Sequence, residues 1–350
     1  MQETHNITQK KRVLSGIRAT GRLHLGNYLG AVKGMLALQA DPSFETLYMV
    51  ADIHTITTPY SVEELRVNRR EVITDYLAAG LDPERSILFL QSMVHEHAEL
   101  AFYFASVMSI ARMQHLPTFK DKVKQYPDHA TMALLNYPLL MASDILMYKA
   151  QLVPVGIDQE PHIEIAREVA RKMNETYGTD FPEPVRFATT GEYVPSLKGT
   201  GKMSKSVEGS FINLTDDLAL VTKRLSTAPT DSGKGTISAG RSESEKTYTD
   251  QSGVVSGGVA NLLTLVEFFE GTEKRAEYDA AYTSSGLRYG DVKRGLAAAI
   301  FKELQPIQEK RAYLEAHPAY VDDVILHGAQ KARQIAEETL AQVRTAMGLG

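Results

Sequence analysis

The 350-residue sequence contains no cysteine and no tryptophan. Without cysteine the chain can form no disulfide, and we expect no iron–sulfur cluster, no thiolate zinc site and no cysteine nucleophile. A strong charge of one sign is absent too, because 38 lysine and arginine residues stand against 43 aspartate and glutamate residues, a formal net charge of −5. A histone-like basic protein is therefore excluded, although a local basic face is not.

Long apolar runs are also lacking. The longest, at 130–147, contains Asn136, Pro138, Ser143 and Asp144, which makes it a poor membrane span. Residues 1–12 are polar and lack the apolar segment of a signal peptide. We therefore expect a soluble cytoplasmic protein with no membrane partner, and the length predicts two domains.

The order of the segments predicts an α/β fold. Strands are expected at 13–14, where the chain breaks at Ser15-Gly16, and at 46–53, 86–91 and 152–155, and helices at 23–39, 61–79, 96–113 and 158–177. This alternation favours a parallel, Rossmann-like sheet, in which ligands bind at the carboxyl ends of the strands. The loops after Leu14, Val50 and Val155 are therefore candidate sites.

After about residue 197 the chain changes character. Residues 227–258 are rich in serine, threonine, glycine and charge, which predicts a long loop or an irregular edge. Helices are expected at 259–269, 291–316 and 321–347. The last one carries an apolar stripe that predicts a core or domain contact, formed by Ile325, Ala329, Ala332, Ile335, Ala336, Thr339, Leu340 and Val343.

Two patterns resemble known motifs without satisfying them. Gly201-Lys202 looks like the end of a P-loop, but Ser196 replaces its first glycine and Met203 replaces its serine or threonine. His95 and His97 flank Glu96 and could be metal ligands, yet two exposed histidines at the start of a helix are the favoured interpretation. We expect no metal site formed by protein ligands.

A glycine-rich segment at 15–28 separates the first strand from the first helix. Free N–H groups at a helix start attract phosphate. His24 and Asn27 are three residues apart and share one face of the first turn, and Gly26 between them leaves room for a planar base. For the glycines alone, a tight turn with a helix cap is the alternative; the His-x-Gly-Asn pattern favours a binding site.

A second signal is the run Lys202-Met203-Ser204-Lys205-Ser206, which glycines 199, 201 and 209 surround. Two lysines three residues apart in such a loop can move onto a polyphosphate. An ordinary solvated basic loop is the alternative for this run on its own. Its co-occurrence with the first segment favours a nucleotide site.

These segments resemble the tyrosyl and tryptophanyl subclass of class I aminoacyl-tRNA synthetases, and within it the bacterial-type tryptophanyl-tRNA synthetases. Residues 24–27 are similar to the HIGH motif, and residues 202–206 are identical to KMSKS. Further segments that carry the resemblance lie at 15–17, 24–31, 51–54, 137–146, 152–159, 289–293 and 346–350. The similarity extends from about Val13 to the C-terminus.

The resemblance implies an organisation and an activity. A polar arm at 1–12 would precede a Rossmann-like catalytic domain at 13–196. The KMSKS loop and a helical anticodon-binding domain would span 197–302, and C-terminal helices at 303–350 would pack back toward the catalytic domain. The chain would activate L-tryptophan with ATP, release pyrophosphate and transfer tryptophan to tRNA(Trp). A homodimer and Mg²⁺ carried by ATP are also implied.

The resemblance also implies roles for single residues. Catalysis would depend on Thr20, His24, Asn27, Lys202 and Lys205. ATP would be bound by Arg18, Ala19, Thr20, Gly26, Asn27, Gly156, Ile157, Asp158, Val194, Lys202, Met203, Ser204, Lys205 and Ser206. Tryptophan would be bound by Leu14, Gly16, His54, Tyr137, Met141, Asp144, Val153, Val155 and Gln159.

Asp144 stands in an otherwise apolar stretch, and a buried carboxylate is costly unless it is hydrogen-bonded. An internal ion pair or a helix cap is one possible partner. The resemblance implies a different one, the indole N–H of tryptophan, which would discriminate against ligands without this donor. Tyr137 and Gln159 would hold the substrate ammonium group. The apolar slot would come from four residues that, taken singly, are also typical of a core: Leu14, Met141, Val153 and Val155.

The sequence departs from the family pattern at four positions. Arg18 stands where glutamine is typical, Ile157 where an acid is usual, and Ser143 where alanine is usual; Leu14 is smaller than the aromatic residue often found there. Contacts to tRNA are expected from local positive charge, which would make binding salt-sensitive. The candidates are Arg112, Lys120, Lys122, Lys124, Lys293, Arg294 and Lys302.

Three alternatives remain open from the sequence: a tyrosyl-tRNA synthetase, a catalytically silent synthetase-like paralogue, and a small nucleotidyltransferase. The context of Asp144 favours tryptophan over tyrosine. His24, Asn27 and the two lysines speak against a silent paralogue. A long helical C-terminal region speaks against a small nucleotidyltransferase.

Overall fold

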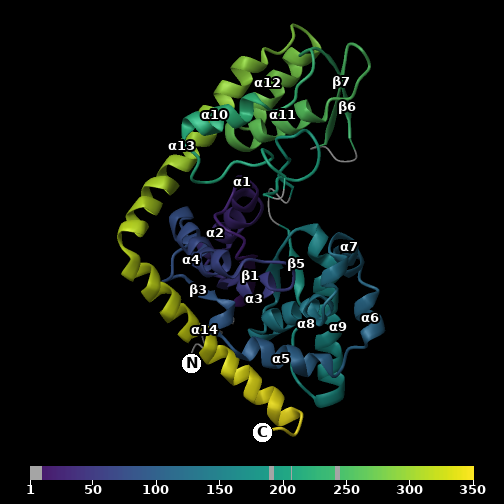
Figure 1. Cartoon of the computed structure of the whole chain (residues 1–350), viewed down its shortest axis with the longest axis vertical. Helices are drawn as coiled ribbons and strands as arrows, with labels where there is room; N and C mark the ends of the chain where they lie inside the picture. The colour runs from purple at the N-terminus through teal and green to yellow at the C-terminus, as the bar shows by residue number, and fades with distance from the viewer. Residues whose placement is uncertain (1–9, 189–192, 206, 241–244) are drawn as a thin grey trace, which may run out of the picture. The chain divides into compact units, whose positions relative to one another are not determined.

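The computed structural model describes residues 10–188, 193–205, 207–240 and 245–350. The chain divides into two compact units (Figure 1). The first contains residues 1–22, 33–189 and 314–350, and the second contains residues 23–32 and 190–313. The segment that begins with His24 therefore belongs with the lysine loop at 202–205. Most of the expected arm at 1–12, and Ser206, lie outside the described residues.

The first unit is built on a five-stranded sheet with the order β3-β2-β1-β4-β5. The strands are β1 (Lys11–Arg18), β2 (Phe44–Ala51), β3 (Ser86–Leu90), β4 (Leu152–Pro154) and β5 (Val185–Phe187). Every neighbouring pair is parallel. The order reverses between β1 and β4, the point at which open α/β sheets bind ligands. The predicted parallel α/β fold is confirmed, whereas β5 was not predicted.

The helices of this unit connect and flank the strands (Figure 1). They are α2 (Lys33–Ala40), α3 (Asp52–Thr55), α4 (Val62–Ala79), α5 (Glu96–Ala105), α6 (Ile110–Gln114), α7 (Pro117–Gln125), α8 (Met132–Met147), α9 (Glu160–Tyr177) and α14 (Pro318–Ala346). Ser61 caps α4 as expected, because its side chain accepts a hydrogen bond from the Glu64 N–H. The single helix predicted at 96–113 is wrong: Ser109 caps a new helix there.

The predicted break of the first strand at Ser15-Gly16 is also wrong. β1 runs on to Arg18, and Gly16 pairs with Met49 of β2. A Cβ atom at Gly16 would lie 2.8 Å from Cγ of Met49. Glycine is therefore needed here because the neighbouring side chain crosses the strand, and not because the chain turns.

The C-terminal helix α14 packs against β3. A Cβ atom at Gly328 would lie 1.7 Å from the carbonyl oxygen of Leu88, so the helix backbone touches the strand backbone. The predicted core contact of the helix is confirmed by its buried residues Ala329, Ala332, Ala336, Thr339, Leu340 and Val343, while Ile325 and Ile335 are half-buried. No helix within the described ranges is long and apolar enough to cross a bilayer.

The second unit combines helices with a small hairpin. Its elements include α1 (Leu25–Asn27), a π-helical turn (Tyr28–Val32), α10 (Leu218–Ser226), β6 (Gly235–Ala239), β7 (Lys246–Asp250), α11 (Gly257–Glu270), α12 (Thr272–Thr283) and most of α13 (Tyr289–Ala316). The irregular edge predicted at 227–258 is wrong in part, because β6 and β7 pair antiparallel there. Tyr248 of β7 is fully buried and donates to Asp279 of α12, which anchors the hairpin.

Candidate active site

Asp144 of α8 is 1% exposed and accepts three hydrogen bonds from protein side chains. Gln91 Nε2 (2.7 Å) and His97 Nδ1 (2.6 Å) donate to Oδ1, and His54 Nε2 (2.8 Å) donates to Oδ2. Burial alone would raise the pKa of Asp144, but the hydrogen bonds from His54 and His97 lower it to about 2. The carboxylate is therefore ionised near neutral pH.

Asp144 has hydrogen-bond partners within the protein, as the alternative of an internal partner for a buried carboxylate predicted. Its expected contact with the indole N–H stays a prediction. An ionised carboxylate offers about four acceptor positions, and Gln91, His54 and His97 use three of them. One position remains on Oδ2, beside the bond from His54.

His97 is not the exposed histidine that its position beside His95 suggested. His95 is exposed, but His97 is fully buried, because α5 begins at Glu96 and turns His97 toward the core. The second ring nitrogen of His97, Nε2, lies 2.7 Å from the hydroxyl of Tyr148. Ser143, one of the departures from the family pattern, donates to the backbone carbonyl of His97 at 2.7 Å. Tyr148 thus holds the imidazole ring and Ser143 holds the backbone of His97, and together they fix this residue against Asp144.

A second histidine that was not predicted connects the two residues expected to hold the substrate ammonium group. His162 of α9 is 2% exposed. Its Nε2 lies 2.7 Å from the Tyr137 hydroxyl, and its Nδ1 lies 3.0 Å from Oε1 of Gln159. The three-residue spacing from Gln159 to His162 at a helix start was the only signal in the sequence, and it is too common to single out this histidine.

The four residues expected to form an apolar slot divide into two pairs. Leu14 and Val153 are 2% exposed and belong to the core. Met141 and Val155 are half-buried and pack against the core from outside. The second pair can therefore meet a ligand directly, whereas the first pair lies behind it.

The expected nucleotide residues of the first unit are mostly at the surface. Arg18 and Thr20 are exposed, while Ala19 is buried. The pKa of Lys122 is lowered by burial and by the positive charge of Arg18, so these two cations lie close to each other. The family pattern has a neutral glutamine at this position, so Arg18 adds a positive charge close to Lys122.

The loop after β4 is folded on itself. A Cβ atom at Gly156 would lie 2.6 Å from Oδ1 of Asp158, so only glycine allows this carboxylate to fold over the backbone. Gln159 Nε2 donates to Oδ2 of the same carboxylate at 2.7 Å. Ile157, where the family pattern has an acid, is 63% exposed.

In the second unit the two sequence motifs meet. His24 pairs with Asn213 in an antiparallel bridge, and the Leu25 N–H donates to the Ile212 carbonyl at 2.9 Å. The lysine loop forms its own bridge, Pro195 to Lys202, and the Met203 N–H donates to the Val194 carbonyl at 2.9 Å. Segments about 180 residues apart therefore form one cluster, because the chain after the loop returns to the start of α1.

His24 is 7% exposed, and its Nδ1 has no hydrogen-bond partner among the described residues. Burial, followed by the charges of Lys205 and Lys202, lowers the pKa of His24 to about 4. The imidazole is therefore neutral near pH 7 and stands beside two cations. A buried polar atom without a partner is costly, so Nδ1 is an atom that a bound ligand or water could satisfy.

Gly26 lies against the His24 ring and the lysine loop. A Cβ atom there would lie 2.7 Å from Cε1 of His24 and 3.3 Å from Cβ of Met203. On the side where a Cβ atom would stand, Gly26 therefore faces the His24 ring and Met203, which is 3% exposed. The expected packing of a planar base against Gly26 stays a prediction. Asn27 uses its Oδ1 to accept from the His24 backbone N–H at 3.2 Å, so it also holds the turn.

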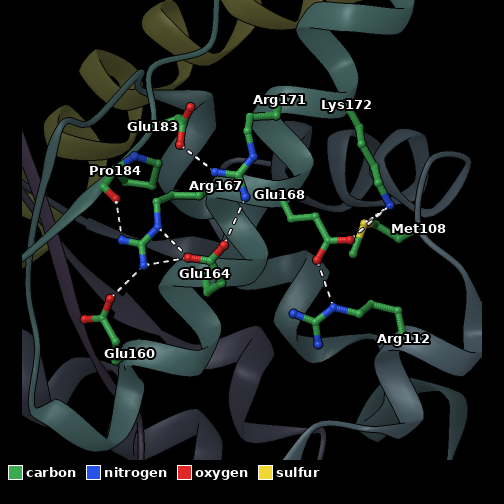
Figure 2. Close-up of polar contacts among 10 residues, drawn as sticks. All are labelled: Met108, Arg112, Glu160, Glu164, Arg167, Glu168, Arg171, Lys172, Glu183 and Pro184. Carbon is green, nitrogen blue, oxygen red and sulfur yellow. Dashed lines mark hydrogen bonds and ion pairs between the residues drawn. The ribbon is translucent and has the colours of Figure 1, made fainter.

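Several candidate tRNA contacts are occupied by protein partners. Nε of Arg112 lies 2.8 Å from Oε2 of Glu168. Figure 2 shows this pair beside the ion pairs of Arg167 and Arg171 along α9. In the second unit, Lys293 donates to the carbonyls of Ser226 and Ala228. Arg294 pairs with Asp291. These cations have partners within the protein, and their expected contacts with tRNA stay a prediction.

No group of three or more histidine, aspartate or glutamate side chains in the described part of the chain could hold a metal ion. The cluster around His24 instead presents two lysines and a neutral imidazole. Such a donor set suits an anion and not a cation.

The sequence matches the family model described as tRNA synthetases class I (W and Y) over residues 6–305. The chain belongs to this family. It is 38% identical to the tryptophan–tRNA ligase of Porphyromonas gingivalis over 339 residues, which is 96% of this chain and 98% of that protein. It is 39% identical to the tryptophan–tRNA ligase of Helicobacter pylori over 346 residues, 97% and 99% of the two chains.

Solved structures of class I synthetases are also similar to this chain. Tryptophanyl-tRNA synthetase from Campylobacter jejuni, complexed with ADP and tryptophan, matches with a TM-score of 0.80 and 30% identity over 97% of this chain and all of that one. The enzyme from Mycoplasma pneumoniae matches with a TM-score of 0.81 and 30% identity, covering 97% and 98%. Tyrosyl-tRNA synthetase from Archaeoglobus fulgidus is 21% identical with a TM-score of 0.65, which shows a shared fold alone.

Proposed function

We propose that this class I synthetase is a tryptophan–tRNA ligase. It activates L-tryptophan with ATP to tryptophanyl-adenylate and pyrophosphate, and then transfers the tryptophan to tRNA(Trp). The observation that carries this proposal is the full-length similarity to ligases of this specificity at 38–39% identity. A buried carboxylate in the first unit and an anion-binding cluster in the second support it.

The tryptophan site is proposed around Asp144, at the edge of the first unit's core. The indole N–H would donate to the remaining acceptor position on Oδ2, beside the bond from His54. Met141 and Val155 would contact the ring, with Leu14, Val153 and Gly16 behind or beside it. A ligand without a donor at this point would leave a charged acceptor unpaired in a dry site, which supports discrimination against purely apolar side chains.

The ATP phosphates are proposed to bind the cluster of the second unit. Lys202 and Lys205 would offset the charge that develops as the carboxylate of tryptophan attacks the α-phosphorus and pyrophosphate leaves. The unpartnered Nδ1 of His24 supports a polar ligand at this point. Mg²⁺ would arrive on the phosphates of ATP, since the described residues of this cluster offer no carboxylate ligand set. No protein nucleophile is needed in either step.

The chain is proposed to act on its tRNA as a homodimer in the cytoplasm, where charged tRNA is used. Phe102 and Ile110 of the first unit support self-association, because they are large apolar side chains that are 76% and 64% exposed. Sedimentation velocity of the wild type and of Phe102→Asp tests this proposal. A monomeric wild type would overturn it.

Exchange of pyrophosphate into ATP tests the activity directly. We expect exchange that depends on tryptophan and does not occur with tyrosine. Asp144→Ala should reduce kcat/KM for tryptophan by about 100-fold or more, because the buried acceptor is lost. Exchange with tyrosine would support the tyrosyl alternative. Tryptophan binding without any exchange would indicate the silent paralogue.

A further inference from the structure

We propose that His162 is a positioning residue for the amino acid substrate. The inference is that it turns the Tyr137 hydroxyl and the Gln159 carboxamide into hydrogen-bond acceptors for the substrate's ammonium group. It rests on the proposed function, because the ammonium group belongs to the amino acid that the enzyme activates. All the residues involved lie in the first unit.

The contacts of His162 join three elements of this unit. Tyr137 belongs to α8, Thr118 to α7 and His162 to α9, and α8 packs along α9 (Figure 1). Nε2 of His162 lies 2.7 Å from the Tyr137 hydroxyl and 3.0 Å from the Thr118 hydroxyl, and Nδ1 lies 3.0 Å from Oε1 of Gln159. The ring of Tyr137 also meets the imidazole edge-on, with centroids 5.1 Å apart.

These contacts determine which ring nitrogen carries the proton. An amide oxygen can only accept, so Nδ1 of His162 must donate to Gln159. Burial, followed by the charge of His54, lowers the pKa of His162 to about 4, with Asp158 opposing this effect. The imidazole is therefore neutral near pH 7. Its Nε2 carries no proton and accepts from the Tyr137 hydroxyl, the nearer of the two hydroxyls. The Thr118 hydroxyl also hydrogen-bonds the Tyr137 side chain, whose own proton stays directed to His162.

The orientation of Gln159 has a second, independent support. Its Nε2 donates to Oδ2 of Asp158 at 2.7 Å, and an ionised carboxylate can only accept. One end of the carboxamide is thus fixed by Asp158 and the other by His162. A flipped amide would break both hydrogen bonds.

Tyr137 and Gln159 are half-buried, so a ligand can reach both side chains. The Tyr137 hydroxyl uses its only proton in the hydrogen bond that it donates to His162, so toward a ligand it can only accept a hydrogen bond. The Oε1 of Gln159 has a second lone pair left. An ammonium group has three donors and no acceptor, which matches this pair. A protonated His162 would instead place a cation beside the ammonium and remove the acceptor that holds Tyr137.

Two ligands that differ only in the ammonium group test the inference. L-Tryptophan and indole-3-propanoate share the indole and the carboxylate, but the second has no ammonium. Because the chain contains no tryptophan, the fluorescence of either bound indole can be followed without background from indole groups of the protein. We expect His162→Phe to raise the Kd of tryptophan about 10- to 50-fold and the Kd of indole-3-propanoate less than about twofold.

Three further variants separate positioning from a general structural role. His162→Gln keeps an amide oxygen near the place of Nε2 and should hold the Kd of tryptophan within about threefold of the wild type. His162→Asn is too short to reach Tyr137 and should give the selective loss even if His162→Phe does not fold. Thr118→Val is the intermediate case, since the Thr118 hydroxyl contacts both Nε2 of His162 and the side chain of Tyr137. It should raise the Kd of tryptophan less than His162→Phe does and leave the Kd of indole-3-propanoate unchanged.

Equal weakening of both ligands in His162→Phe or His162→Asn, or no change in either ligand, would overturn the role of His162. In that outcome the wild type still binds tryptophan and supports exchange, so the proposed function stands. A wild type that binds neither ligand would overturn the proposed function, and the inference with it.

Discussion

Nδ1 of His97 and Oδ1 of Asp144 lie 2.6 Å apart, and both side chains are almost completely buried. The two residues are 47 positions apart in the sequence and belong to α5 and α8. The bond makes the ionised carboxylate tolerable in the core, because a buried charge needs partners. It also restricts the rotation of the carboxylate and so fixes where its remaining acceptor position points.

The hydroxyl of Tyr148 holds the far side of the same imidazole. Tyr148→Phe would leave Nε2 of His97 buried without a partner. We expect the free energy of unfolding of this variant to fall by about 1–3 kcal/mol, measured by urea denaturation. Tyr103→Phe is the control: its hydroxyl pairs with the partly exposed Glu99, and the loss should stay below about 1 kcal/mol. Equal losses in the two variants would contradict the buried network.

Lys205 lies close enough to His24 to lower its pKa. Lys205→Ala should reduce the kcat of pyrophosphate exchange by about 100- to 1000-fold, with a smaller change in the KM for tryptophan, because the charge acts on the departing pyrophosphate. Lys198→Ala, an exposed lysine outside the Lys-Met-Ser-Lys run, should leave kcat within about twofold. A similar loss of kcat in both variants would indicate that the overall positive charge of the region matters, and not a specific contact of Lys205 with pyrophosphate.

Gly26 is expected to tolerate no side chain. In Gly26→Ala the new Cβ would collide with the His24 ring, which must then turn away from its place between Gly26 and the lysine loop. We expect kcat/KM in the exchange assay to fall by about 10-fold or more. In Gly290→Ala the new Cβ would lie 3.6 Å from the nearest atom, an ordinary contact. Replacing this helical glycine should leave activity unchanged and raise stability by up to about 1 kcal/mol.

The two buried neutral histidines, His24 and His162, should make the protein less stable in mild acid. Their pKa is lowered from 6.5 to about 4 in the folded state, by burial first. Between these values the unfolded chain binds protons that the folded chain does not. Stability is therefore expected to fall as the pH drops from 7 to 5, by about 2 kcal/mol for each histidine.

Urea denaturation at pH 7 and pH 5 measures this effect. The carboxylate of Asp144 does not interfere, because its lowered pKa of about 2 keeps it ionised over this interval. His162→Gln should lose roughly half of the pH dependence and keep the rest, which belongs to His24. A wild type whose stability is the same at both pH values would show that neither imidazole is buried in its neutral form.

The sequence predicted those features that depend on local patterns. Alternating segments predicted the parallel sheet, and the Ser61-x-x-Glu64 spacing predicted the start of α4. The two motifs predicted which residues would gather around His24, and the structure brings Val194, Met203 and the two lysines to the same unit. The functional roles of these residues remain predictions.

The missed features depend on contacts between distant segments. His97 looks like half of an exposed pair until α8 brings Asp144 to it, and His162 gains its meaning only from Tyr137. In the sequence Gly16 looks like a turn residue, but glycine is needed there because the Met49 side chain of the next strand leaves no room for a Cβ atom. No local pattern carries such information, since each partner lies at least 25 residues away.

Strand β3 ends the sheet on one side, so within the described part of the chain its outer backbone groups have no neighbouring strand. An uncovered edge of this kind is a template on which another chain can add a strand and start aggregation. The close approach of Gly328 to Leu88 brings a helix backbone onto this border. Helix α14 therefore also covers the edge of β3 and hinders the addition of a strand from another chain. Any side chain larger than hydrogen at residue 328 would push the helix away from this edge.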